Sequence, residues 1–157
     1  MTADFSLQQL NTFIVKAKAA TYIGDGKISP SHRPGSHDLQ FHEGTFSYLD
    51  SYFGGSDFLG QEVVYYREIP VWAMNYYGRI IELEKITAAE AGQILKESLS
   101  RMYEEGRFLG GFEHAAKGCT YTDTSQGDTT SFTGKEWITR ESIRVYELVY
   151  HGGLINP

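Results

Sequence analysis

The alternation of apolar and polar residues divides the chain into a helix, a run of strands, a second helix and a second run of strands. Ser6 and Gln9 form a capping box that predicts the start of the first helix, and an apolar stripe at helical spacing follows it. Thr87 and Glu90 form a second capping box, and the stripe after it ends before Gly106. We therefore expect two amphipathic helices, each with one face for a core.

Period-2 patterns bounded by turn residues predict seven strands, four before the second helix and three after it. Their predicted positions are 38–42, 45–52, the two arms of a hairpin at 58–79, 119–124, 130–138 and 143–151, with a turn at 126–128. Short connections favour antiparallel pairing. The expected fold is α+β: a curved, mainly antiparallel sheet of about six to seven strands with two helices on one face, in the order α-ββββ-α-βββ. No internal repeat is evident, and the length suits a single domain over 1–157.

The hairpin at 60–79 has large side chains on both of its faces. Since Pro70 cannot donate to a central ladder, the chain is expected to reverse around it, with Glu62 opposite Asn75. Alternation then places this pair on one face, surrounded by Tyr66 and Tyr77. An odd number of loop residues would change these partners. Two helices cover one face only, so the other is expected to be exposed, covered by the irregular loop at 24–37, or covered by a second subunit.

Paired carboxylates are the chemistry that the hairpin suggests. Asp50 and Glu62 approach each other if their strands are neighbours, and burial among tyrosines would raise the pKa of such a carboxyl group. Glu62 is then a buried structural residue, a ligand anchor or an acid/base catalyst. Arg79 suits an anionic ligand or a surface ion pair. The candidate ligand-binding residues are Glu62, Asn75, Tyr66, Tyr77, Tyr48, Asp50, Arg79, Arg33, His37 and His151.

Metal and nucleophile sites have little support in the sequence. On one strand, Asp38 and His42 would share a face but lie roughly 13 Å apart, too far for one metal ion. A metal site would need the loop to bring His32 or His37 back to one of them. Ser36 lacks the second glycine and the preceding strand of a nucleophile elbow. Cys119, the only cysteine, has no activating partner in the pattern. We expect no catalytic residue, no metal and no cofactor.

Composition narrows the partners and the compartment. The formal charge is −6, and the lysines and arginines are scattered, which argues against direct binding to nucleic acid. No apolar run reaches transmembrane length, so no membrane partner is expected and the location is expected to be cytoplasmic. The 11 tyrosines suit a wide sheet and a binding surface equally well.

Four motifs together resemble an uncharacterised bacterial and archaeal family of domains of unknown function. They are RPGSHDL at 33–39, YLDSYFGGSDFLGQEVV at 48–64, PVWAMNYYGR at 70–79 and VYELVYHGGLI at 145–155. Domains of that family occur alone or after an Xre/Cro-type helix-turn-helix, so the resemblance implies a domain that can follow a DNA-binding module. It supplies no catalytic residues. In this chain the first helix leads into strands, which leaves no place for a helix-turn-helix.

Three functional hypotheses follow. The leading one is a domain that binds or senses a small molecule in an aromatic-lined pocket on the Glu62 face of the hairpin, under the 24–37 loop. The first alternative is a protein-interaction module whose second sheet face forms a homodimer or partner interface. The second is an acid/base enzyme centred on Glu62.

Overall fold

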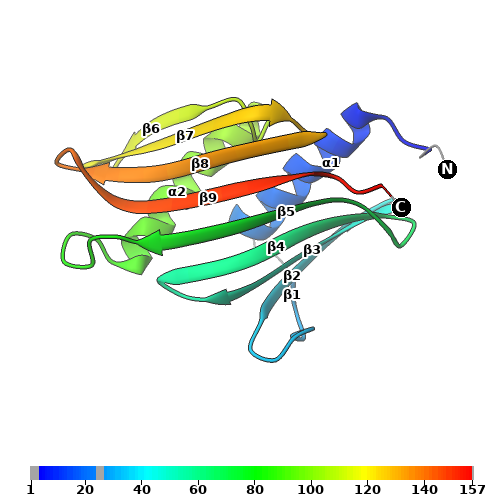
Figure 1. Ribbon diagram of the computed structural model, residues 1–157, viewed down its shortest axis with the longest axis horizontal. Helices are drawn as coiled ribbons and strands as arrows, with labels where there is room; N and C mark the ends of the chain where they lie inside the picture. Colours follow the sequence, from blue (N-terminus) through cyan, green and yellow to red (C-terminus); the bar gives the residue numbers. More distant parts are fainter. Residues whose placement is uncertain (1–3, 24–26, 157) are drawn as a thin grey trace.

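The computed structural model of the chain describes residues 4–23 and 27–156. Within these ranges the chain forms two α-helices, a π-helical turn and a nine-stranded sheet (Figure 1). The helical elements are α1 Leu7–Lys18, the π-helical turn Ala19–Ile23 and α2 Ala88–Glu104. The strands are β1 Lys27–Ser29, β2 His37–Glu43, β3 Phe46–Gly54, β4 Asp57–Tyr66, β5 Ile69–Ile80, β6 Phe112–Ala116, β7 Cys119–Asp128, β8 Ser131–Arg140 and β9 Ile143–Leu154.

Two antiparallel meanders make up the sheet. The strand order is β1-β2-β3-β4-β5-β9-β8-β7-β6, so the first meander, β1 to β5, meets the second, β6 to β9, where β5 pairs with β9. Both helices lie on the same side of the sheet (Figure 1). We call the helix-covered side of the sheet the inner face and the opposite side the outer face.

The expected fold class and both capping boxes are confirmed, with Ser6 and Thr87 as the N-caps. The number of strands was underestimated, because β1 and β6 are too short to show a clear alternating pattern. The turn expected at 126–128 is also wrong: β7 continues through these residues, and the chain reverses after Asp128, which pairs with Ser131. Of the irregular loop expected at 24–37, residues 24–26 lie outside the described residues, and β1 follows them.

The predicted register of the β4–β5 hairpin is wrong by one residue. Arg67 and Glu68 have positive φ angles and form a two-residue turn, so the chain reverses before Pro70. The register then shifts at a bulge between Val64 and Tyr65. As a result, Glu62 lies opposite Met74, and Gln61 lies opposite Asn75.

This shift separates the residues that were expected to surround Glu62. Because side chains alternate along a strand, Glu62 lies on the inner face with Trp72 and Met74, all buried. Asn75 and Tyr77 lie on the outer face. The hairpin therefore does carry large side chains on both faces. The residues of β5 that were expected beside Glu62 were placed there by the error in the register between the two strands.

The two meanders are a structural duplication, contrary to the absence of a repeat expected from the sequence. Strands β4 and β5 correspond to β8 and β9 residue by residue, at the constant offset that separates Tyr76 from Tyr150. Each hairpin turn consists of two positive-φ residues, and each hairpin has its register shift at the equivalent place. The identical residues at this offset are Phe58/Phe132, Gly60/Gly134, Glu62/Glu136, Ile69/Ile143, Val71/Val145, Tyr76/Tyr150 and Gly78/Gly152.

A pseudo-twofold axis passes between β5 and β9, where the equivalent residues Tyr76 and Tyr150 are direct cross-strand partners. The helices follow the same relation, because α1 packs on β2 and β3 while α2 packs on β6 and β7. Counted from the N-caps, Phe13 and Ile94 occupy the same helix position, and both are buried. The fold is thus two α-β₄ units, α1 with β2 to β5 and α2 with β6 to β9, that share one sheet, and β1 is an additional strand at the edge of the first unit.

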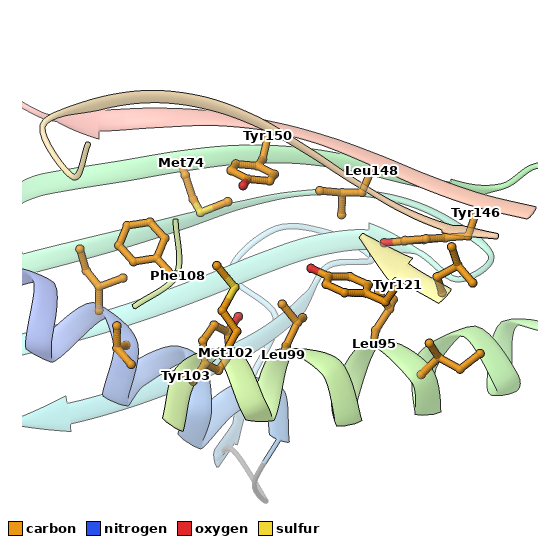
Figure 2. Close-up of a cluster of buried hydrophobic side chains, with 14 of the residues drawn as sticks. Met74, Leu95, Leu99, Met102, Tyr103, Phe108, Tyr121, Tyr146, Leu148 and Tyr150 are labelled. Carbon is orange, nitrogen blue, oxygen red and sulfur yellow. The ribbon is translucent and has the colours of Figure 1, made fainter. Parts of the chain in front are cut away.

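The core lies between the inner face and the helices. Figure 2 shows Met74, Leu148 and Tyr150 pointing from the sheet toward Leu99 and Met102 of α2. These side chains belong to one cluster of buried apolar residues to which both helices contribute. At ~25 cal/mol per Å² of apolar surface, burial of this kind is the main source of stability for an amphipathic helix on a sheet.

Candidate functional site

Four carboxylates are buried on the inner face, and we call them the carboxylate cluster: Asp50, Glu62, Asp123 and Glu136. Asp50 pairs with Glu62 across β3 and β4. The equivalent pair in the second meander is Asp123 with Glu136, across β7 and β8. Direct cross-strand partners have Cβ atoms about 4.5–5.5 Å apart, so each pair concentrates two carboxyl groups at one point of the core.

Tyrosine hydroxyl groups donate hydrogen bonds to every member of the cluster. Tyr48 donates to Glu62, and its equivalent, Tyr121, donates to Glu136 over 2.6 Å. Because these donors are buried with their acceptors, the bonds offset part of the cost of desolvating the carboxyl groups. The remaining hydrogen bonds are Tyr76 to Asp50 at 2.6 Å, Tyr150 to Asp123 at 2.8 Å and Tyr146 to Glu136 at 3.0 Å.

Two glycines allow Tyr76 and Tyr150 to reach across an intervening strand to their acceptors. Tyr76 reaches Asp50 by crossing Gly60 on β4, where an added Cβ atom would lie 2.3 Å from the Tyr76 hydroxyl oxygen. Gly134 has the same role under the ring of Tyr150, at 2.0 Å from its Cζ atom. Any side chain at either glycine would occupy the place of the ring.

Lys18 supplies the positive charge of the first meander. Its side chain points into the core from the last turn of α1, and its Nζ atom lies 2.9 Å from both carboxylate oxygens of Glu62. The same ammonium group contacts the sulfur of Met74 at 3.2 Å and lies 5.4 Å from the centre of the Phe108 ring. At 7% exposure, Lys18 is a buried ion-pair partner.

Burial shifts the pKa values of three members of the cluster upward. It raises the pKa of Asp50 to about 7, with a further contribution from the charge of Glu62. The pKa of Glu136 also rises to about 7 through burial, although Tyr121 opposes the shift by donating to the carboxylate. Burial raises the pKa of Asp123 to about 6. These three carboxyl groups are therefore protonated at a higher pH than ordinary carboxyl groups.

One oxygen of the cluster is left without a donor. Asp123 is only 3% exposed, and its Oδ2 atom has no hydrogen-bond partner among the described residues. The other oxygen, Oδ1, accepts from Tyr150. An unpartnered carboxylate oxygen in a core costs about 1–3 kcal/mol or more, so it calls for a water molecule or a ligand.

Two adjoining cavities border the cluster. The inner cavity has a volume of about 60 Å³, and Asp123, Glu136 and Lys18 are among the residues that line it. The outer pocket, between α2 and the ends of β3, β4 and β5, has a volume of about 400 Å³ and an opening to the surface. Asp50 and Tyr76 are among the residues that line both, so the two spaces meet at these side chains.

The structure brings together three of the ten residues proposed from the sequence: Tyr48, Asp50 and Glu62. Tyr66 lies at the turn end of the hairpin and packs against Phe5 and Phe46. The other six also lie away from the carboxylate cluster. Five of them lie on the outer face: Tyr77, His151, Asn75, Arg79 and Arg33. There Asn75 accepts a hydrogen bond from Gln61, Arg79 forms an ion pair with Glu147, and Arg33 lies over the Phe53 ring. His37 packs on Tyr52 at the start of β2.

Residues 31–36 of the loop that was expected to cover the pocket pack elsewhere. Asp38, buried at the start of β2, accepts hydrogen bonds from the main-chain N–H of His32 and from the hydroxyl of Ser51. Burial by itself would raise the pKa of Asp38, but these donors hold it below its usual range. Arg33 also binds Ser51, on the outer face. Residues 31–36 are therefore fixed on the side of the sheet opposite Glu62.

Lys18, Asp123 and Glu136 were missed in the sequence, although each leaves a local signal. Lys18 follows Ile14 at helical spacing and so lies in the apolar stripe of α1. Asp123 continues the alternating series Cys119, Tyr121, and Glu136 lies at the equivalent inward position of β8. A polar residue at an inward position of an apolar series is the pattern that identifies such a site.

Two further observations concern metal ligands and membrane-spanning helices. In residues 4–23 and 27–156, no group of three or more His, Cys, Asp or Glu side chains is arranged to hold a metal ion. No helix in the same part of the chain is long and apolar enough to cross a membrane.

Comparison with known protein families identifies one family whose model matches the chain. The family model described as Domain of unknown function (DUF5680) matches residues 50–155. The chain belongs to this family. The matched segment contains all four members of the carboxylate cluster, while Lys18 and the rest of α1 precede it. Searches of curated proteins and of solved structures gave no match.

Proposed function

We propose that this protein binds a small organic molecule in the outer pocket, with the polar end of the ligand directed at the carboxylate cluster. The observation that supports this most directly is that Asp50 and Tyr76 line both the outer pocket and the inner cavity. Ligand sites are concave and largely apolar, with a few converging polar groups, and titratable groups with shifted pKa values gather at them.

The walls of the outer pocket suit this function. Leu39, Ile80 and Leu95 line it with apolar surface, and Gly92 opens it on the side of α2. Its volume of about 400 Å³ lies within the ~300–1,000 Å³ typical of small-molecule sites. The pocket thus has apolar walls and a polar end at Asp50 and Tyr76, which suits a ligand with an apolar body and one polar group.

A thermal-shift screen of a diverse metabolite and fragment library tests the proposal. An added Cβ atom at Gly92 meets no atom within 4 Å, so Gly92→Phe fills the pocket without a clash with the backbone. Gln93→Phe places the same ring on the exposed surface of α2 outside the outer pocket. We expect compounds that stabilise the wild type and Gln93→Phe but not Gly92→Phe. A library in which no compound shows this difference would contradict the proposal.

An interaction surface on the outer face is a second candidate. Leu59, Tyr77 and Val149 are direct cross-strand neighbours on β4, β5 and β9, and they are 56%, 43% and 50% exposed. This continuous apolar row favours a homodimer interface. Light scattering at micromolar concentration should then give the mass of a dimer for the wild type and of a monomer for Tyr77→Lys. A monomeric wild type rules the homodimer out.

An acid/base reaction in the same pocket would use Asp50 rather than Glu62. Both oxygens of Glu62 already bind Lys18, whereas Asp50 borders the open pocket and has a pKa of about 7. A pKa near the working pH suits a general acid or base. A pH-dependent turnover in a hydrolase and isomerase screen that disappears in Asp50→Asn supports this role, and the absence of any turnover contradicts it.

We further propose a sensing role in the cytoplasm of a bacterial or archaeal cell. The motif resemblance to domains that follow helix-turn-helix modules supports it, because sensor domains can occupy that position. The formal charge of −6 supports a role without direct contact to nucleic acid. Co-purification of a DNA-binding protein that is lost on ligand addition is the expected result.

A further inference from the structure

We propose that the ligand is a primary amine whose ammonium group binds between Asp123 and Glu136, while its apolar body fills the outer pocket. This inference rests on the proposed small-molecule function and assigns its ligand class. Three observations support it, from hydrogen bonding, from charge and from the duplication of the fold.

The hydrogen-bonding groups of the inner cavity call for a donor. The hydroxyl groups of Tyr76, Tyr121 and Tyr150 already donate to carboxylates, so they do not offer their protons to a ligand. Tyr22 and Tyr103 also line the cavity, with hydroxyl groups that can donate or accept. The clearest unfilled position is an acceptor, the unpartnered Asp123 Oδ2 atom. An ammonium group has three donors and no acceptor, which makes it complementary to this wall.

The charge of the inner cavity calls for a cation. All four members of the carboxylate cluster line it, and Lys18 is the single lysine or arginine among its described lining residues. Lys18 is committed to Glu62 through both carboxylate oxygens. The charge of Arg107 acts on Asp123, but its hydrogen bonds go to Glu105 and to the main-chain carbonyl groups of Leu109 and Gly111. A ligand ammonium group would compensate the charge that remains in the second meander.

The duplicated fold shows how each half accommodates an ammonium group. In the first half, Lys18 places its ammonium group against Glu62. Counted from the N-caps, Leu99 is the equivalent residue of α2, and it lines the same inner cavity as Glu136, the equivalent of Glu62. The second half thus retains the acceptor but has an apolar side chain where the first half has a lysine. The missing cation is the part that we assign to the ligand.

The sizes of the two spaces define the rest of the ligand. The inner cavity, at about 60 Å³, exceeds the ~10–15 Å³ that admits one water molecule, so it has room for an ammonium group. The outer pocket is lined mainly by apolar side chains, and Lys96 is a further lining residue on α2. A second positive charge on the ligand would be repelled there. A monoamine with an apolar body is therefore favoured over a polyamine.

Matched probes test the ligand class directly. Isothermal titration calorimetry is performed with 2-phenylethylamine, 2-phenylethanol and 3-phenylpropanoate, and with hexylamine, hexan-1-ol and hexanoate. Within each set the body is similar and the polar end changes. We expect the amine to bind at least ~10-fold more tightly than the alcohol and the carboxylate. Equal or tighter binding of an alcohol or a carboxylate overturns the inference.

Two variants locate the ammonium group. Asp123→Asn keeps the shape and removes the charge, and it should reduce the preference for the amine to less than ~3-fold. Asp57→Asn, an exposed substitution of the same kind on β4, should leave the preference as in the wild type. Unchanged preference in Asp123→Asn contradicts the assigned position.

Leu99→Lys supplies the missing cation from within the chain. We expect it to fold, because Lys18 already occupies the equivalent position, and to bind the amine at least ~10-fold more weakly than Leu99→Met, which matches it in length without charge. If Leu99→Lys does not fold, Asp123→Asn still decides the matter. Equal amine affinity in the two folded variants overturns the inference.

The results separate this inference from the proposed function. If the amines fail to bind but other library compounds bind in the Gly92→Phe-sensitive manner, the ligand class is wrong and the pocket stands. If no compound of any class binds, both are wrong.

Discussion

Tyr76 and Tyr150 face each other across β5 and β9, and each crosses a glycine on the neighbouring strand to donate to an aspartate one strand further on. The acceptors, Asp50 and Asp123, belong to β3 and β7. This arrangement ties the two halves of the sheet to one buried group of carboxylates. The two halves differ in one charged residue, because Lys18 of α1 has no charged equivalent on α2.

The glycines under the tyrosine rings should be sensitive to the smallest substitution. Gly60→Ala places a Cβ atom at the Tyr76 hydroxyl group, and we expect a loss of roughly 1–3 kcal/mol in the free energy of unfolding. Gly92→Ala, in the open on α2, should instead stabilise by about 0.5–1 kcal/mol. Urea unfolding measures both, and a neutral Gly60→Ala would show that the ring relocates freely.

The buried ion pair should be far more sensitive than an exposed one. Lys18→Met leaves Glu62 charged in the core without its partner, and the expected cost is about 3–5 kcal/mol. Lys16→Met, which removes an exposed pair with Glu43, should cost less than about 1 kcal/mol. Adding Glu62→Gln to Lys18→Met should restore part of this loss. If the double variant loses more free energy of unfolding than the two single variants added together, the pairing is contradicted.

Stability should fall as the pH rises from about 4 to 7. The pKa values of Asp50 and Glu136 are raised to about 7 in the folded state, compared with about 4 in the unfolded chain. The folded protein then holds more protons in this interval, so the free energy of unfolding should be larger at pH 5 than at pH 8. Asp38 has a lowered pKa, and its contribution is lost only below about pH 4.

Urea unfolding at pH 5, 6, 7 and 8 measures this dependence. Each unit by which a folded pKa exceeds the unfolded value corresponds to about 1.4 kcal/mol. Asp50→Asn, which keeps an acceptor for Tyr76, should flatten the curve. A free energy of unfolding that rises between pH 5 and pH 8 would contradict the upward shifts.

Amine binding should release protons. An ammonium group beside Asp123 and Glu136 favours their charged forms, so we expect the affinity for 2-phenylethylamine to rise from pH 6 to pH 8. At pH 7 the released protons are taken up by the buffer, so the binding enthalpy should be more negative in Tris than in phosphate. This difference should be smaller in Asp123→Asn. The titratable and charged groups around this pair are Lys18, Tyr22, Asp50, Glu62, Tyr76, Tyr103, Arg107, Tyr121, Tyr146 and Tyr150.

The helices could be predicted from the sequence because their signals are local. The capping boxes at Ser6 and Thr87 set each start, and the apolar stripes set the buried face. The proximity of Asp50 and Glu62 followed in the same way, once the strands were assumed to be neighbours. Lys18 was within reach of the same reasoning, since a charged residue in an apolar stripe requires a buried partner.

The hairpin register could not be obtained in this way. The alternation within each strand was correct, but the match between the arms depended on the turn at Arg67 and Glu68 and on the bulge after Val64. A shift of one residue moves a whole arm to the other face, which is why Asn75 and Tyr77 were placed beside Glu62.

By itself, the sequence determined the fold class, the two capped helices and the presence of a carboxylate pair at Asp50 and Glu62, because these depend on residues close together in the chain or on adjacent strands. Only the tertiary structure decided that Asp123 and Glu136 form the equivalent pair, and that Lys18 serves one pair and not the other. The physical reason is that β5 and β9 are distant in sequence and pair directly in the sheet. That pairing brings two half-sites into one core, where burial gives their charges an energetic cost that a ligand can offset.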